Sequence, residues 1–115
     1  MTISRIIEVL EARLLTKGAD CTREVHTACG SDMMSDVLAY VKDQAVLLTG
    51  LNNPQVVRTA DMMDMICIVF VRGKCPDDML LALAEERGIA VMATDKTMFT
   101  ACGLLYNEGL RGGVG

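Results

Sequence analysis

The run Ile66-Cys67-Ile68-Val69-Phe70-Val71 decides the fold of this chain. Six consecutive apolar residues, four of them β-branched, are typical of a strand that is covered on both faces. The polar sequence Arg72-Gly73-Lys74 ends the run and predicts a turn. A strand buried on both faces belongs to a parallel sheet with helices above and below it, so the run predicts an α/β fold.

Working outward from this strand, the same rhythm repeats along the chain. Further strands are predicted at 45–49 and 89–93, and a more alternating one at 24–29. Helices are predicted at 2–12, 31–41, 54–64, 76–87 and 97–107. Regular alternation of strand and helix with short connections favours right-handed crossovers and a mainly parallel sheet.

Residues at the expected helix ends support these boundaries. Thr2 and Ser31 are expected N-caps, with Asp32 in the first turn of the helix over 31–41. Pro54 and Pro76 are expected to open the next two helices, because proline suits the first helical turn.

Length and composition indicate one domain, which we expect over residues 1–109 with a flexible Gly-rich tail at 110–115. Apolar residues make up 51% of the 115 residues, which excludes intrinsic disorder. A net charge of −4 argues against duplex binding, and 3% aromatic residues argue against a single-strand platform. We therefore expect no nucleic-acid partner, and the absence of a long apolar run predicts no membrane span.

Cysteine usage favours a reducing compartment. The five cysteines are odd in number and form no C-x-x-C pair, and the N-terminus does not resemble a signal peptide. We therefore expect reduced thiols in a cytoplasmic protein.

The loops that follow the predicted strands are candidate binding elements for an anion. Ligands of open parallel sheets lie beyond the carboxyl ends of the strands, where helix N-termini favour negative charge. Cations at this edge add to that preference, so a phosphate-bearing small molecule is the predicted ligand. The candidate residues are Gly50, Asn52, Asn53, Arg58, Arg72, Gly73, Lys74, Thr94 and Thr97. The alternative is that the asparagines are caps, the glycines turn residues and the cations simply solvated.

No catalytic motif is complete, so we expect no enzyme activity. Gly73-Lys74 resembles the end of a phosphate-binding loop, but Cys75 follows where Ser or Thr is required, and no G-x-G-x-x-G occurs. The single histidine, His26, leaves no support for a catalytic triad. We expect no cofactor. The alternative is a metal, iron–sulfur or redox role for Cys29, Cys75 or Cys102.

Several stretches together carry a family resemblance. They are residues 29–39 (CGSDMMSDVLA), 48–60 (LTGLNNPQVVRTA) and 68–74 (IVFVRGK), with 97–99 and 101–103 behind them. Over about residues 20–107 the chain resembles a stand-alone DRTGG domain, of the type encoded near iron-only hydrogenases. The pentapeptide that names the family is absent. Where relatives often carry Gly-Asp-Arg, this chain has Gly50-Leu51-Asn52, so a ligand role of that Asp-Arg pair does not carry over.

The resemblance implies a three-layer α/β/α fold like the N-terminal domain of HPr kinase/phosphorylase. It also implies a non-catalytic regulatory or interaction module that dimerises, with a hydrogenase or kinase component as a further partner. The apolar composition points to a homodimer as well, because a chain this short leaves apolar surface outside its core. Methionine-bearing helix surfaces at 31–41 or 53–64 are expected to contribute to that interface.

Overall fold

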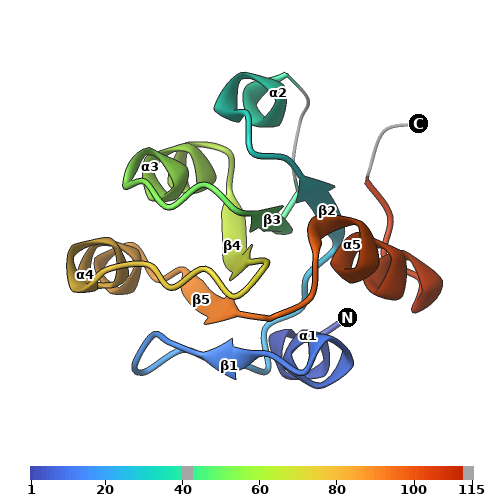
Figure 1. The fold of residues 1–115 in the computed structure, drawn as a ribbon. Coiled ribbons are helices and arrows are strands. Elements are labelled where there is room, and N and C mark those ends of the chain that lie inside the picture. The colour runs from blue at the N-terminus through green and yellow to red at the C-terminus, as the bar shows by residue number, and fades with distance from the viewer. Residues whose placement is uncertain (40–42, 113–115) are drawn as a thin grey trace.

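In the computed structural model, which describes residues 1–39 and 43–112, strands and helices alternate from Thr27 onward as the sequence predicts (Figure 1). A short strand that the sequence did not predict lies between the first helix and Thr27. The strands are β1 (Arg13–Leu14), β2 (Thr27–Gly30), β3 (Ala45–Thr49), β4 (Met65–Phe70) and β5 (Ala90–Ala93). The helices are α1 (Ile3–Leu10), α2 (Met34–Leu38), α3 (Gln55–Met62), α4 (Asp78–Glu86) and α5 (Met98–Asn107). The prediction of an α/β fold is confirmed.

The sheet has the strand order β1-β5-β4-β3-β2. Strands β2 to β5 are parallel and lie side by side in chain order, whereas β1 pairs antiparallel with β5. Because each right-handed crossover steps in the same direction, α2, α3 and α4 cover one face of the sheet. Helices α1 and α5 cover the other face, which completes three layers (Figure 1).

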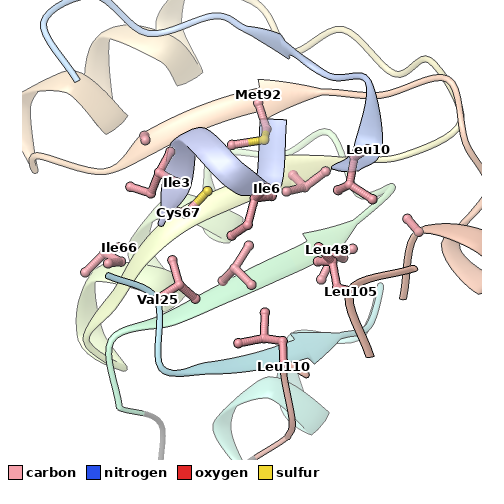
Figure 2. Packing of buried hydrophobic residues seen from close by; sticks show 14 of the residues in the cluster. Ile3, Ile6, Leu10, Val25, Leu48, Ile66, Cys67, Met92, Leu105 and Leu110 are labelled. Carbon is pink, nitrogen blue, oxygen red and sulfur yellow. The ribbon is translucent and has the colours of Figure 1, made fainter. Parts of the chain in front are cut away.

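Each face of the sheet has its own apolar core. Ile6 of α1 and Leu105 of α5 pack with Leu48 and Val69 on one face (Figure 2). Phe70 lies on the opposite face, in the core beneath α3 and α4. All six residues of β4 are buried, as a strand covered on both faces requires.

An irregularity in β4 changes which side chains share a face. Ala45 pairs with Met65, but the next residue, Val46, pairs with Cys67, so Ile66 is an extra residue. As a result Ile66 and Cys67 both belong to the core under α1 and α5 (Figure 2).

The predicted N-cap of the first helix is confirmed. The Thr2 hydroxyl accepts a hydrogen bond from Arg5 N–H at 3.1 Å and caps α1. The predicted opening of the next-to-last helix at Pro76 is wrong, because α4 begins at Asp78 and Pro76 precedes its cap. Asp77 caps α4 by accepting from Leu80 N–H at 2.9 Å, and Gly88 follows that helix with a φ of +70°.

The start of the helix predicted at 31–41 is wrong. Helix α2 begins at Met34 with Met33 as a cap that makes no side-chain bond, and residues 40–41 lie outside the described part of the chain. Ser31 instead accepts Met33 N–H at 3.0 Å in a local turn. Asp32 is not in the first helical turn, because its carboxylate is bonded to the loop after β3.

The chain remains packed beyond residue 109. Leu110 is buried in the core under α1 and α5, and Ala28 N–H donates to the Arg111 carbonyl at 2.9 Å. The structure therefore places Leu110 and Arg111, which the sequence assigns to the tail, against the domain; residues 113–115 of that tail lie outside the described chain. None of the described helices is long and apolar enough to cross a membrane.

Candidate functional site

Four loops meet at the carboxyl edge of the sheet, because β2 to β5 are parallel and end on the same side. Direct bonds join these loops to one another. Gly50, after β3, is bonded to Asp32, after β2. Arg72 and Gly73, after β4, are bonded to the loop after β5. The structure thus brings together the loops that carry the residues predicted from the sequence.

Asp32 is the central residue that sequence reasoning missed. Its Oδ1 accepts Gly50 N–H at 2.6 Å and the Thr49 hydroxyl at 3.2 Å. The signal was present in the sequence, because Asp32 follows Gly30 at the end of a strand, which is where ligand-facing residues are expected. The competing prediction of a helix start at Ser31 places Asp32 in the first helical turn instead, and so leaves it out of the predicted site.

The guanidinium of Arg72 lies directly over Gly50. Its Nη2 atom is 3.6 Å from Asp32 Oδ2, and its side chain is about half exposed at 49%. A Cβ atom on Gly50 would come within 2.2 Å of Arg72 Nη2, so only glycine leaves room for the guanidinium. Residue 50 is therefore a glycine because another side chain occupies the space above it.

The backbone at Arg72 adopts an unusual conformation. Arg72 has a φ of +61° and Gly73 a φ of +69°, and both lie in the left-handed region. For an arginine this conformation is unfavourable by about 1–2 kcal/mol. It is held in place by two hydrogen bonds, from Arg72 N–H to the Lys96 carbonyl at 2.8 Å and from Gly73 N–H to the Thr94 carbonyl at 2.9 Å. Strained residues that surrounding structure holds in place cluster at functional sites.

The asparagines at this edge have structural partners. Asn53 Oδ1 accepts Gln55 N–H at 2.8 Å at the start of α3, as the capping alternative predicts. Asn52 Nδ2 donates to the Cys75 carbonyl at 3.3 Å, which ties the loops after β3 and β4 together.

Two cations remain available at or near the edge. Lys74 follows Gly73 and is exposed, and Arg58 is exposed on α3. Neither side chain has an ion-pair partner among the described residues.

The two threonines have different roles. Thr94 is buried, and its hydroxyl donates to the Leu10 carbonyl at 2.7 Å, so it anchors the loop to α1 rather than facing solvent. Thr97 caps α5 by accepting Thr100 N–H at 3.4 Å.

This arrangement already holds one negative charge at the position predicted for an anion. The Asp32 carboxylate takes the Gly50 N–H and lies beside the Arg72 guanidinium, as a bound phosphate oxygen would. A ligand anion must therefore approach Arg72 from its exposed side or replace Asp32 there.

The cysteines fall into separate environments. Cys75 is exposed on the loop after β4, far in the chain from the partly buried Cys102 on α5. Burial raises the pKa of the Cys102 thiol, and the neighbouring Cys29 thiol raises it further. Cys102 Sγ also lies 3.8 Å from Met98 Sδ. Within residues 1–39 and 43–112, no three His, Cys, Asp or Glu side chains gather in a way that would hold a metal ion.

A cavity of about 230 Å³ opens at the opposite, amino-terminal edge of the sheet. Ile3, Ile66 and Ile89 form its apolar floor, and Lys17 and Arg23 lie on its rim. Part of the hydrogen-bonding capacity of the rim is used within the protein, since Arg23 donates to the Gly88 carbonyl at 3.2 Å. Sequence reasoning did not identify this cavity, because its lining comes from distant segments of the chain.

Comparison with known proteins identifies relatives of this arrangement. A family model described as the DRTGG domain matches residues 5–107. Among solved structures, the chain is similar to the CBS and DRTGG domains of the regulatory region of Clostridium perfringens pyrophosphatase, complexed with the activator diadenosine tetraphosphate. The TM-score is 0.75 at 17% identity, over 90% of this chain and 45% of that one, so this chain spans less than half of that neighbour. No curated protein matches the chain in sequence.

Proposed function

Because this chain belongs to the DRTGG domain family, we propose that it is a non-catalytic regulatory module that senses a small phosphate-bearing ligand and dimerises. The observation that carries the proposal is Arg72, a half-exposed cation held in a strained backbone conformation where the strand-end loops meet. A strained, positioned guanidinium at the carboxyl edge of a parallel sheet suits recognition of an anion.

The chemistry of the edge favours phosphate over a neutral ligand. Arg72 offers several N–H donors in a planar fork, which matches the oxygens of a phosphate group. Lys74 adds a second charge two residues further along, and it has no ion-pair partner in the part of the chain that the structure describes. The solved neighbour is a regulatory region that was captured with a nucleotide activator, which supports a nucleotide as the first ligand to test.

The wider partner is proposed from the resemblance to small proteins encoded near iron-only hydrogenases. In this proposal the module associates with a hydrogenase or kinase component in redox metabolism. Affinity purification of the tagged chain from anaerobically grown cells tests this part. Recovery of neither type of protein above the level seen with an unrelated tagged domain of similar size would contradict it.

A second candidate function is redox or metal chemistry at Cys102. The proximity of Cys102 Sγ to Met98 Sδ, and its electrostatic interaction with Cys29, favour this candidate over the exposed Cys75. Soft sulfur ligands of this kind suit Cu(I). Stoichiometric copper in anaerobically purified protein, lost in a Cys102→Ser variant, would support the metal role, whereas a metal-free protein would exclude that role.

The experiment that tests ligand sensing is a thermal-shift and calorimetric titration with ATP, AMP, diadenosine tetraphosphate and pyrophosphate. A ligand that binds only the folded state raises the apparent stability. We expect Arg72→Ala to weaken binding by about 1.5–3 kcal/mol, the scale of a hydrogen bond to a charged group. Arg87→Ala is the matched control, because Arg87 is also a half-exposed arginine with one carboxylate partner, Asp61, but at the end of α4. Equal affinity for the two variants would place the site elsewhere.

A further inference from the structure

The outer face of α5 is apolar and unusually exposed. Phe99 is 89% exposed and Tyr106 60% exposed. Cys102 and Gly103 lie between them, so the four residues have the spacing i, i+3, i+4 and i+7 of one helix face. With Met98 they line an open apolar hollow. The inner face of the same helix is occupied by the core residues Ala101 and Leu105, so α5 is apolar on both sides.

Helix α5 carries no charge. Its sequence, MFTACGLLYN, contains no Asp, Glu, Lys or Arg, while the whole chain has a net charge of −4. Exposed faces elsewhere are charged; α3 carries Asp61 and α4 carries Glu85 and Glu86. Two copies of a negatively charged chain repel each other, and the residues of α5 add no like charges to a shared face. A cation borders the face at one end, where Arg111 Cζ lies 3.8 Å from the centroid of the Tyr106 ring.

The pattern on this face is self-complementary. The small residues Cys102 and Gly103 lie at the centre of the face. An aromatic residue lies beyond each of them, Phe99 on one side and Tyr106 on the other. In an antiparallel pair of α5 helices related by a two-fold axis, small residues oppose small ones at the centre and Phe99 of one protomer opposes Tyr106 of the other. The small centre allows close approach, and aromatic pairs favour the ends.

The exposed area suits a dimer. From their exposures, Phe99 and Tyr106 on both protomers together offer roughly 450–750 Å² to an interface. Stable interfaces bury roughly 1,200–2,000 Å² in total, so the four rings alone supply about a third or more of the lower limit.

Gly103 has no evident role among the residues that the structure describes, 1–39 and 43–112. A Cβ atom added there would meet nothing within 4 Å, and glycine inside a helix is unfavourable. The presence of glycine is explained if a neighbouring helix passes over this position, because that helix needs the space that a side chain would fill.

We infer that the outer face of α5 is the homodimer surface, occupied by α5 of a second copy in an antiparallel pair with the two-fold axis between Cys102 and Gly103. The inference rests on the dimerising part of the proposed function. It differs from the surfaces that the sequence favoured, since Met33 and Met62 are exposed singly, without the aromatic pair found on α5.

The test is the mass in solution of the ligand-free protein, measured by sedimentation equilibrium from one to several hundred micromolar. The wild-type chain is expected at twice its mass of 12.4 kDa. Phe99→Glu places a charge at the interface, and Gly103→Leu fills the space at the axis. Each is expected to raise the dimer dissociation constant at least tenfold, while circular dichroism and the melting temperature stay close to those of the wild-type monomer.

Met79→Glu is the matched control, because Met79 is 74% exposed on α4 and its variant is expected to remain dimeric. A wild-type dimer that both α5 variants leave intact would overturn the inference but keep dimerisation. A wild-type monomer throughout the range would overturn dimerisation itself. Neither result depends on the nucleotide titrations, so the dimer inference and the ligand-sensing proposal can fail independently of each other.

Discussion

Asp32 and Gly50 join the loops that follow two neighbouring strands, through a hydrogen bond of 2.6 Å from Gly50 N–H to Asp32 Oδ1. The carboxylate thus occupies a backbone donor that an anion would otherwise use, and it does so beside Arg72. A site that holds its own negative charge binds a foreign anion in competition with that charge.

Removing this charge is expected to strengthen anion binding. Asp32→Asn keeps an oxygen acceptor for Gly50 N–H but no longer opposes a phosphate. We expect roughly three- to tenfold tighter binding of the ligand found in the nucleotide screen, a modest gain because the site is half exposed. Calorimetry of the variant beside wild type measures the change. Weaker binding by Asp32→Asn would instead make the carboxylate a ligand contact.

Gly50→Ala tests the position of the guanidinium. The added Cβ would lie within 2.2 Å of Arg72 Nη2, the end of a flexible side chain, so Arg72 is expected to move while the fold persists. Ligand affinity should then fall as far as in Arg72→Ala, with a melting temperature within a few degrees of wild type. Full affinity in a folded Gly50→Ala protein would show that Arg72 does not need this position.

Val69→Asp is expected to unfold the domain. Val69 is fully buried in β4 between its neighbours in the sheet, and an unpaired carboxylate there costs several kcal/mol, comparable with the whole stability of a small domain. Met79→Asp introduces the same group at an exposed position and should unfold with an unchanged urea midpoint. Cooperative unfolding of Val69→Asp near the wild-type midpoint would contradict the burial of this strand.

Thiol alkylation should follow exposure and acidity. Cys75 is exposed, whereas burial raises the pKa of both Cys67 and Cys102 and leaves them less thiolate at a given pH. With iodoacetamide at pH 8, peptide mass spectrometry should detect modification first at Cys75, then at Cys102, and at Cys67 only after unfolding. Early labelling of Cys67 in native protein would show that the sheet opens readily.

Ligand binding and dimerisation are expected to influence each other. The Arg72 and Gly73 N–H groups bond to Lys96 and Thr94, and that loop leads directly into α5. If the ligand shifts this loop, it must change the dimer dissociation constant by the same factor by which dimerisation changes ligand affinity. Sedimentation with saturating ligand, beside titrations above and below the dimer midpoint, measures both factors. Thermodynamic linkage requires the ligand's effect on dimerisation to equal the effect of dimerisation on ligand affinity. If the two measured factors differ, the two experiments have not measured the same species.

The sequence predicted the elements whose signals are local. The continuous apolar character of β4 and the cap residue Thr2 determine structure within a few residues, and these predictions are confirmed. The antiparallel pairing of β1 was not predicted, because a strand of two residues has no period and depends on its partner β5.

The site was predicted less completely for a related reason. The sequence showed which loops follow the predicted strands and therefore lie at the carboxyl edge of the sheet. Arg72 was identified because it lies in one of these loops. The bond between Asp32 and Gly50 depends on how two loops face each other, and the competing local signal of a helix start at Ser31 directed Asp32 to the wrong role. The α5 face was missed because an apolar residue in a helix is expected to face the core, and only the packing of Ala101 and Leu105 shows that Phe99 faces outward.

The strand order also bears on how the chain folds in time. From β2 to β5 each strand pairs with the next one along the chain, so every one of these pairings closes a short segment and can form early. The contact of β1 with β5 joins opposite ends of the sequence and cannot form during synthesis until β5 has left the ribosome. Strand β1 therefore pairs long after it is made, and until then the edge of β5 is open to pairing with strands of other chains.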